Sequence, residues 1–280
     1  MPWSSKARWK RRTRTRPGRK PTVGSPGSGW SWCWSPRAKC TGCWAPQGRR
    51  RVSQDRWTES GPVAEALGTF VAAVADAKFF LGRRVAEWSV GAPELESAVA
   101  CAAVAQEELG HARVLYPLLA DLPLRTPLAP LEREDGRAVV FCPEFLRQPW
   151  RTWPEAVVGL ALVDTALTVA LQAATSSAHE ELARRACRIV EEERFHTVFA
   201  WGRVRALVSR LPADAGESLI ATRLAQVLRW LSDATAGLGV LRAAGVVDAT
   251  GDAVRERYFT QVRAQLEGLE VQIPELVAAG

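Results

Sequence analysis

Histidine, methionine and long apolar runs are scarce in this chain. The 280 residues include three histidines and one methionine, and no stretch reaches the roughly 20 uninterrupted apolar residues that a membrane-spanning helix needs. The basic N-terminal segment lacks an adjoining apolar stretch, which argues against a secretory signal. Cys101, Cys142 and Cys187 lie far apart in apolar surroundings, as is typical of reduced core thiols. We therefore expect a cytoplasmic protein with no membrane partner.

Residues 1–58 differ in composition from the rest. They hold 15 basic residues, one acid and seven of the twelve tryptophans, whereas the remaining chain carries a net charge of −7. Without a periodic apolar face, this segment is predicted to be a disordered extension. Three interpretations stay open: an arm that binds nucleic acid or anionic surfaces, a metal knuckle of Cys33, Cys40 and Cys43, and non-native sequence from a start site placed too far upstream. The excess of Trp and Arg favours the last. A closed zinc site needs four ligands, and the rest of the chain is mildly acidic, so neither zinc nor nucleic acid is expected.

Two of the three histidines occur in one repeated motif, a glutamate followed three residues later by a histidine. The pairs are Glu108/His111 in QEELGHARVLY and Glu193/His196 in VEEERFHTVFA. Residues three apart on a helix point the same way, so each pair can bind one metal ion. Two such helices supply half of a ferritin-like di-metal cage, and one carboxylate from each of two further helices completes it. The third histidine, His179, lies near an expected helix start and is interpreted as exposed.

Two further positions should complete the cage. Asp164 stands in the apolar run AVVGLALVDTALTVALQ, where an unpaired carboxylate is costly, and it precedes Glu193 by 29 residues. The same offset before Glu108 falls at position 79, where no carboxylate stands. Lys78 lies on the apolar seam of that segment. Asp76, the nearest acid, is about 200° around the helix from Lys78, so we do not expect it to reach the cage.

The charge of these residues decides how many metal ions they suit. Four carboxylates balance two divalent ions, but three carboxylates and one ammonium total −2, which matches one divalent ion or none. Lys78 is the only lysine after residue 57, in a region with 21 arginines. A single Glu-x-x-His match is common on solvated faces, and a structural polar network is the alternative to a metal site. Two copies in apolar seams favour a buried metal or charge cluster. We predict that Lys78 bridges carboxylates or replaces a metal, and that the ligands are Glu108, His111, Asp164, Glu193 and His196.

From about residue 60 the patterned segments have helical periodicity and none has the alternation of a strand. Helices are predicted at 62–89, 93–120, 154–176, 178–210, 214–237 and 251–269. The short turn at 91–93, with Pro93 in the first turn of the next helix, makes the first two antiparallel neighbours. Several prolines after residue 122 predict a long crossover with one short helix near Pro143. Ser177 with Glu180 predicts a capping box, and Thr250 a further cap. The predicted fold is all-α, a ferritin-like four-helix bundle with two additional C-terminal helices, in a domain of residues 59–275.

Residues 60–270 resemble the A and C subunit family of ring-1,2-phenylacetyl-CoA epoxidase, a bacterial multicomponent oxygenase of phenylacetate breakdown. The segment ADAKFFLGRRVAEWSVGAPELE is similar to the opening of the C-type, structural subunits. The segments AQEELGHARVLY, LALVDTAL and EEERFHTVFA are similar to the di-iron motifs of the A-type, catalytic subunit. By this resemblance the five predicted ligands match the family's ligand positions, and Lys78 matches the remaining one, a glutamate in the catalytic subunit.

The resemblance implies an iron pair that activates O2 to epoxidise the aromatic ring of a CoA thioester, with electrons from a separate flavin and iron–sulfur reductase. We expect a subunit of such a monooxygenase, in a homo- or hetero-oligomer with other oxygenase subunits and a reductase, and with an acyl-CoA as a possible substrate. The expected cofactor is iron, as one ion, two or none, although other divalent metals suit the same ligands. Two alternatives stay open: a non-catalytic structural subunit of that complex, and a ferritin-like iron-oxidising protein, which the LGRRVAEW opening disfavours.

Overall fold

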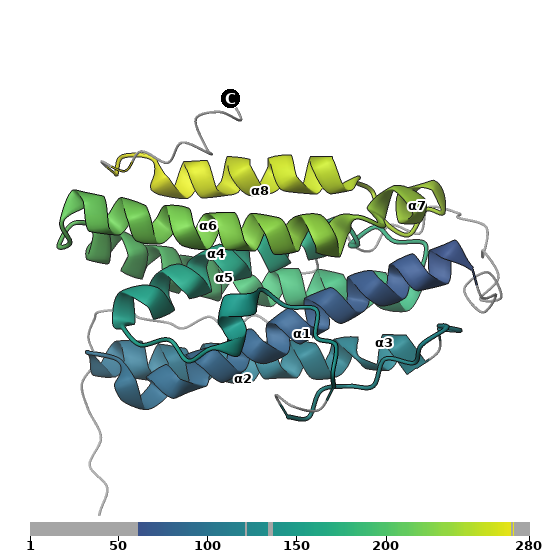
Figure 1. Ribbon diagram of the computed structural model, residues 1–280, viewed down its shortest axis with the longest axis horizontal. Helices are drawn as coiled ribbons and strands as arrows, with labels where there is room; N and C mark the ends of the chain where they lie inside the picture. Colours follow the sequence, from purple (N-terminus) through teal and green to yellow (C-terminus); the bar gives the residue numbers. More distant parts are fainter. Residues whose placement is uncertain (1–60, 121, 134–136, 270, 272–280) are drawn as a thin grey trace, which may run out of the picture. The chain divides into compact units, whose positions relative to one another are not determined.

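A computed structural model describes residues 61–120, 122–133, 137–269 and 271, and these residues form helices and loops with no strand among them. Four long helices make the bundle: α1 (Pro62–Gly91), α2 (Leu95–Leu115), α4 (Trp153–Gln172) and α5 (Glu180–Val208) (Figure 1). They are joined or followed by α3 (Pro117–Ala120), the 3-10 turn η2 (Glu144–Arg147), α6 (Ala213–Thr235), α7 (Leu238–Ala243) and α8 (Gly251–Leu266). The predicted ferritin-like bundle with additional C-terminal helices is confirmed, and the short α7 is an addition to it. The predicted extension at 1–58 lies outside the described residues.

Helix α4 is the central helix of this arrangement. It contacts α1, α5, α6 and α8, so apolar side chains are needed on almost every side of it. Among the described helices, it alone has the length and hydropathy of a candidate membrane span, and 89% of that window is buried inside the protein. Burial among four neighbouring helices accounts for its composition.

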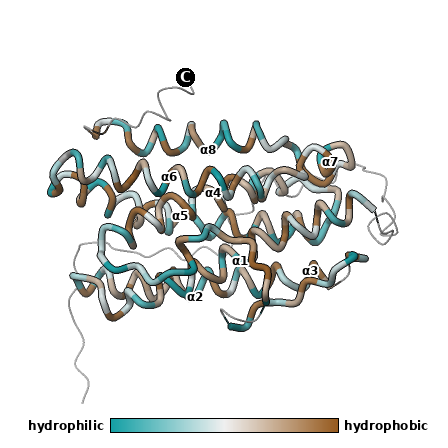
Figure 2. Tube along the Cα trace, viewed as in Figure 1, coloured by the Kyte–Doolittle hydropathy of each residue, from teal (hydrophilic) through white to brown (hydrophobic). Residues whose placement is uncertain are grey.

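The C-terminal helices α6 and α8 lie side by side against α4 (Figure 1). Hydrophobic and hydrophilic residues alternate along both, as expected for helices that cover a core on one side (Figure 2). The hydroxyl of Thr250 accepts a hydrogen bond from the N–H of Ala253, so the predicted cap of α8 is present. The turn before α8 is fixed to the end of α4, because the N–H of Asp248 donates to the carbonyl of Ala173 at 2.8 Å.

Helix α2 is shorter than predicted at both ends. Its N-cap is Glu94 and its first residue is Leu95, so Pro93 precedes the helix instead of lying in its first turn. At the other end the helix stops at Leu115, because Pro117 has no N–H to continue the hydrogen-bond ladder and α3 begins there as a separate turn.

The start of α5 differs from the predicted capping box. The N-cap is His179, whose Nδ1 accepts from the N–H of Leu182 at 3.2 Å. The hydroxyl of Ser177 instead accepts from the N–H of His179 at 3.0 Å. His179 is therefore half-buried, and its interpretation as an exposed residue was wrong.

Asp76 anchors the crossover between α2 and α4 onto α1. Its fully buried carboxylate accepts hydrogen bonds from the Tyr116 hydroxyl and from the N–H of Phe141, each at 2.9 Å, and from the guanidinium of Arg137. Burial raises the pKa of Asp76, although the three donors oppose that shift. The carboxylate lies in this clamp and not in the predicted cage.

Candidate metal centre

Each of the four bundle helices contributes to one buried cluster of charged side chains. The predicted site residues are almost fully buried, with exposed fractions of 0–4%: Lys78 on α1, Glu108 and His111 on α2, Asp164 on α4, and Glu193 and His196 on α5. The helical periods that placed these residues on inward seams are the reason that they meet, since each helix turns the same face to the bundle axis.

Lys78 lies among the carboxylates of the cluster. Its Nζ is 2.9 Å from Oε1 of Glu108 and 3.4 Å from Oδ1 of Asp164, and it also forms a close ion pair with Glu193. Burial of the ammonium acts to lower the pKa of Lys78, but the charges of Glu108, Glu193 and Asp164 outweigh it and raise the pKa. One cation thus pairs with a carboxylate from each of the three other bundle helices.

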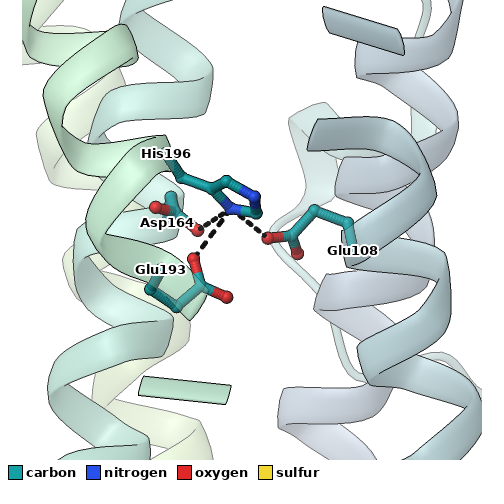
Figure 3. A group of neighbouring side chains, drawn as sticks. All are labelled: Glu108, Asp164, Glu193 and His196. Carbon is teal, nitrogen blue, oxygen red and sulfur yellow. Dashed lines mark hydrogen bonds and ion pairs between the residues drawn. The ribbon is translucent and has the colours of Figure 1, made fainter. Parts of the chain in front are cut away.

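Four of the predicted ligands form a compact donor set. Ligand atoms of Glu108, Asp164, Glu193 and His196 all lie within 4.8 Å of one another. Figure 3 shows the imidazole of His196 facing the three carboxylates. Its Nδ1 is 3.1 Å from Oε1 of Glu108, 3.7 Å from Oδ1 of Asp164 and 2.9 Å from Oε2 of Glu193. Burial acts to lower the pKa of His196, and its hydrogen bonds to the carboxylates raise it above the ordinary value.

Two of the three carboxylates around the ammonium have pKa values shifted in opposite directions. Burial and the charge of Glu193 raise the pKa of Asp164 well above its ordinary value. Burial also acts to raise the pKa of Glu193, but the charge of Lys78 and the close contacts with His111 and His196 lower it well below that value. Glu193 is therefore the carboxylate that the neighbouring cations hold in its ionised form.

His111 lies at the edge of the cluster, outside the four-residue donor set. Its Nδ1 is 3.1 Å from Oε1 of Glu193, without the geometry of a hydrogen bond. It shares the Glu-x-x-His motif of His196, but only His196 belongs to the four-residue donor set. The pairing of two complete half-sites expected from the repeated motif is therefore uneven.

Two glutamates that were not predicted as site residues bind the histidines on the side that points away from the cluster. Nε2 of His196 donates to Glu107 at 2.8 Å, and Nε2 of His111 donates to Glu192 at 2.9 Å. Each donor and acceptor lie on different helices, so α2 and α5 brace one another twice. Because an ionised carboxylate only accepts hydrogen bonds, both Nε2 atoms carry protons and both Nδ1 atoms face the cluster. The signal was available in the sequence, because the residue before each motif glutamate is a second glutamate.

Gly82 lets α2 approach α1 beside the cluster. It lies one turn beyond Lys78, and a Cβ there would be 3.0 Å from Cβ of Glu108 and 2.9 Å from the side chain of Leu109. A larger residue would push the two helices apart. The distance between Lys78 and Glu108 depends on this contact.

A small apolar cavity lies two helical turns along the bundle from the cluster. Val85, Cys101, Val157 and Ala200 line it, and each is seven residues from the cluster residue of its own helix, about 10.5 Å along the axis. The cavity has room for about one water molecule. Burial raises the pKa of the Cys101 thiol to about 11, so the thiol stays protonated.

The donor set has the residue types to hold one divalent cation. Oε2 of Glu108, Oδ2 of Asp164 and Oε2 of Glu193 are buried and meet no hydrogen-bond donor in good geometry, which is costly for carboxylate oxygens unless a cation is near. With His196 they offer carboxylate and imidazole ligands of the kind that iron, manganese or zinc accepts. The ammonium of Lys78 contacts three carboxylates of the same set, Glu108, Asp164 and Glu193.

Comparison with known protein families gives one extended match. The model of a family described as phenylacetic acid catabolic protein matches residues 52–279. The chain belongs to the phenylacetic acid catabolic protein family. A search of curated proteins finds no match to the chain.

Membership in the phenylacetic acid catabolic protein family confirms the resemblance noted in the sequence. The family acts in phenylacetate catabolism as a component of a multisubunit oxygenase complex. This member of the family has a buried cluster of two glutamates, one aspartate and one histidine that could bind a metal ion.

Proposed function

We propose that this chain is a subunit of a phenylacetyl-CoA epoxidase-like multicomponent oxygenase in which Lys78 replaces one of the two cations of a di-metal centre. Glu108, Asp164, Glu193 and His196 then hold at most one divalent ion, for which iron is the family's usual metal. A bound ion would supply Lewis acidity and, in the case of iron, one-electron chemistry. Other oxygenase subunits, a reductase and an acyl-CoA substrate complete the proposed system.

The proposal rests on the contacts of the Lys78 ammonium with carboxylates from three other helices. Lysine suits this position because its charge is compact and its stem flexible, whereas the planar fork of arginine is bulkier. Three carboxylates, one ammonium and one divalent ion sum to zero, and a buried cluster is stable only near neutrality.

Metal content after reconstitution tests this proposal. The purified chain is incubated anaerobically with excess Fe(II), desalted and analysed by inductively coupled plasma mass spectrometry. We expect one iron per chain, and two tightly held irons would overturn the proposal. Asp164→Asn should remove the bound iron, because it takes a ligand from the donor set. Asp76→Asn is the matched control, since it changes an equally buried carboxylate outside the cluster and should leave the metal content unchanged.

A second candidate is a non-catalytic structural subunit of the same complex, with a metal-free cluster that joins the four helices. The packing beside the cluster favours it, because the neighbouring cavity has room for about one water molecule and not for an aromatic ring. This candidate predicts no iron after reconstitution and the same unfolding midpoint with and without chelator. One bound iron and a midpoint that rises with Fe(II) would instead support the single-metal proposal.

A further inference from the structure

An apolar surface lies on the outer side of α2 and α5, opposite the cluster. Leu95 and Val99 on α2 are 77% and 62% exposed, and Phe195 and Val198 on α5 are 79% and 75% exposed. Single exposed apolar residues are normal, but a continuous group of them marks an interaction site. We call this surface the α2–α5 face; it consists of Leu95, Val99, Ala102, Ala103, Phe195, Val198, Gly202 and Ala206, all exposed.

The register of the two helices makes the surface continuous. Arg203 pairs with Glu94 at 3.0 Å at one end of the α2–α5 contact, and His196 pairs with Glu107 at 2.8 Å further along. The helices are therefore antiparallel, and Val99 lies at the level of the segment 195–202. The apolar residues of α2 and those of α5 are thus side by side.

The exposed residues repeat as helix-packing residues do. On α5 the exposed positions Glu191, Phe195, Val198, Gly202 and Arg205 are spaced by four, three, four and three. This is the spacing of a seam that packs against another helix. The opposite seam of α5 carries the buried cluster, so the helix has one packed seam and one whose neighbour is missing among the described residues.

The charges of the two helices are opposite. The exposed charged residues of α2 and its N-cap are three acids and one arginine: Glu94, Glu96, Glu107 and Arg113. Those of α5 are four arginines and two acids: Glu180, Arg184, Arg188, Glu191, Arg194 and Arg205. The exposed charges of α2 are therefore net acidic and those of α5 net basic.

We propose that the α2–α5 face is the interface of a symmetric dimer of this chain. A two-fold axis along the helices places α2 of one protomer on α5 of its partner, so that each acidic helix meets a basic one and the apolar centres coincide. Residues at the same level then face each other, which sets Glu96 opposite the partner's Arg205. The occupant is a second copy of the chain, because that copy presents the same acidic α2 and basic α5 at the same distance from each other. The proposed dimer does not depend on the metal content of the cluster.

Light scattering coupled to gel filtration tests the dimer on the full chain. At micromolar concentration we expect twice the mass of the 30.6 kDa chain. Val99→Asp or Val198→Asp should weaken dimerisation at least 100-fold and give a monomer with an unchanged circular dichroism spectrum. Val139→Asp is the matched control, because Val139 is 61% exposed on the crossover, and this variant should remain a dimer.

Charge reversal tests the pairing of the helices. Glu96→Arg and Arg205→Glu should each weaken the dimer, and the two together should restore it, because the reversed charges again face each other. A wild-type monomer, or a chain that associates only with a different oxygenase subunit, would overturn the proposal. A dimer that Val99→Asp and Val198→Asp leave intact would overturn the placement of its interface. Iron content is measured on the same samples, so failure of the dimer and failure of the metal proposal are distinguishable.

Discussion

Replacing Lys78 tests the central feature of the cluster, the pairing of one ammonium with three carboxylates. Lys78→Met keeps the length of the side chain and removes its charge. Lys78, Glu108 and Glu193 are fully buried and Asp164 is 1% exposed, so the carboxylates left behind have little access to water. Removal of one partner from a buried ion pair costs about 3–5 kcal/mol. With an m-value of about 2–3 kcal/mol/M in urea, the unfolding midpoint should fall by about 1–2.5 M in the presence of a chelator.

Lys78→Glu separates the role of the charge from the role of the position. It removes the same ammonium and adds a fourth carboxylate, so in chelator it should be at least as unstable as Lys78→Met. In Fe(II) it should bind two ions, because four carboxylates balance two divalent charges. Each ion at 100 times its dissociation constant stabilises the folded state by about 2.7 kcal/mol. Lys78→Met is the control, since it lacks the new ligand and should gain no second ion.

Urea unfolding followed by circular dichroism, in chelator and in anaerobic Fe(II), gives both stabilities, and elemental analysis gives the metal content. A Lys78→Met protein as stable as the wild type in chelator would show that the ammonium does not hold the carboxylates. Equal metal content in the two variants would show that position 78 does not face a metal site.

Three further outcomes are expected from the structure. His196→Ala should abolish divalent-ion binding measured by calorimetry, whereas His111→Ala should weaken it less, because His111 lies outside the donor set; equal losses would contradict that division. Tyr116→Phe should lower the free energy of unfolding by about 1–3 kcal/mol, because it leaves the buried carboxylate of the crossover clamp without one donor, and an unchanged urea midpoint would contradict this. Gly82→Ala should destabilise by about 1–3 kcal/mol through the clash with α2, and Gly110→Ala, where a Cβ meets nothing within 4 Å, should instead be neutral or stabilising by up to about 1 kcal/mol.

The convergence of the cluster could be predicted because a helix has a fixed period. Lys78, Glu108, Asp164, Glu193 and His196 each fall on the apolar seam of a long helix, and four such seams in one bundle have a common axis to face. The same periodicity excluded Asp76 from the cage, since it is two positions from Lys78 and residues two apart on a helix point to nearly opposite sides. The predicted helix ends were less accurate than the predicted faces. The end of α2 depends on the N–H that Pro117 lacks, and the start of α5 depends on whether Ser177 or His179 forms the cap. Such ends are decided by single local hydrogen bonds.

The braces behind the histidines required information that no single helix contains. Glu107 meets His196 and Glu192 meets His111 only because α2 and α5 run antiparallel in one register. The clamp on Asp76 likewise depends on where the crossover returns to α1, and a loop without periodicity does not specify this. Sequence patterns fix the face of an element, whereas contacts between elements depend on how the whole core packs.

We expect position 78 to decide the metal content of the site without changing the fold. The layer two turns away, with Val85, Cys101, Val157 and Ala200, is apolar and does not depend on the charge of the cluster. Within the cluster, an ammonium at position 78 removes one carboxylate and adds one positive charge, so a bundle that would be neutral with two divalent ions is neutral with one. The apolar seams of the four helices are the same with an ammonium or with a carboxylate at position 78. We therefore expect the single substitution Lys78→Glu to convert the lysine-paired cage into a two-cation cage without a redesign of the core, which makes it the decisive variant.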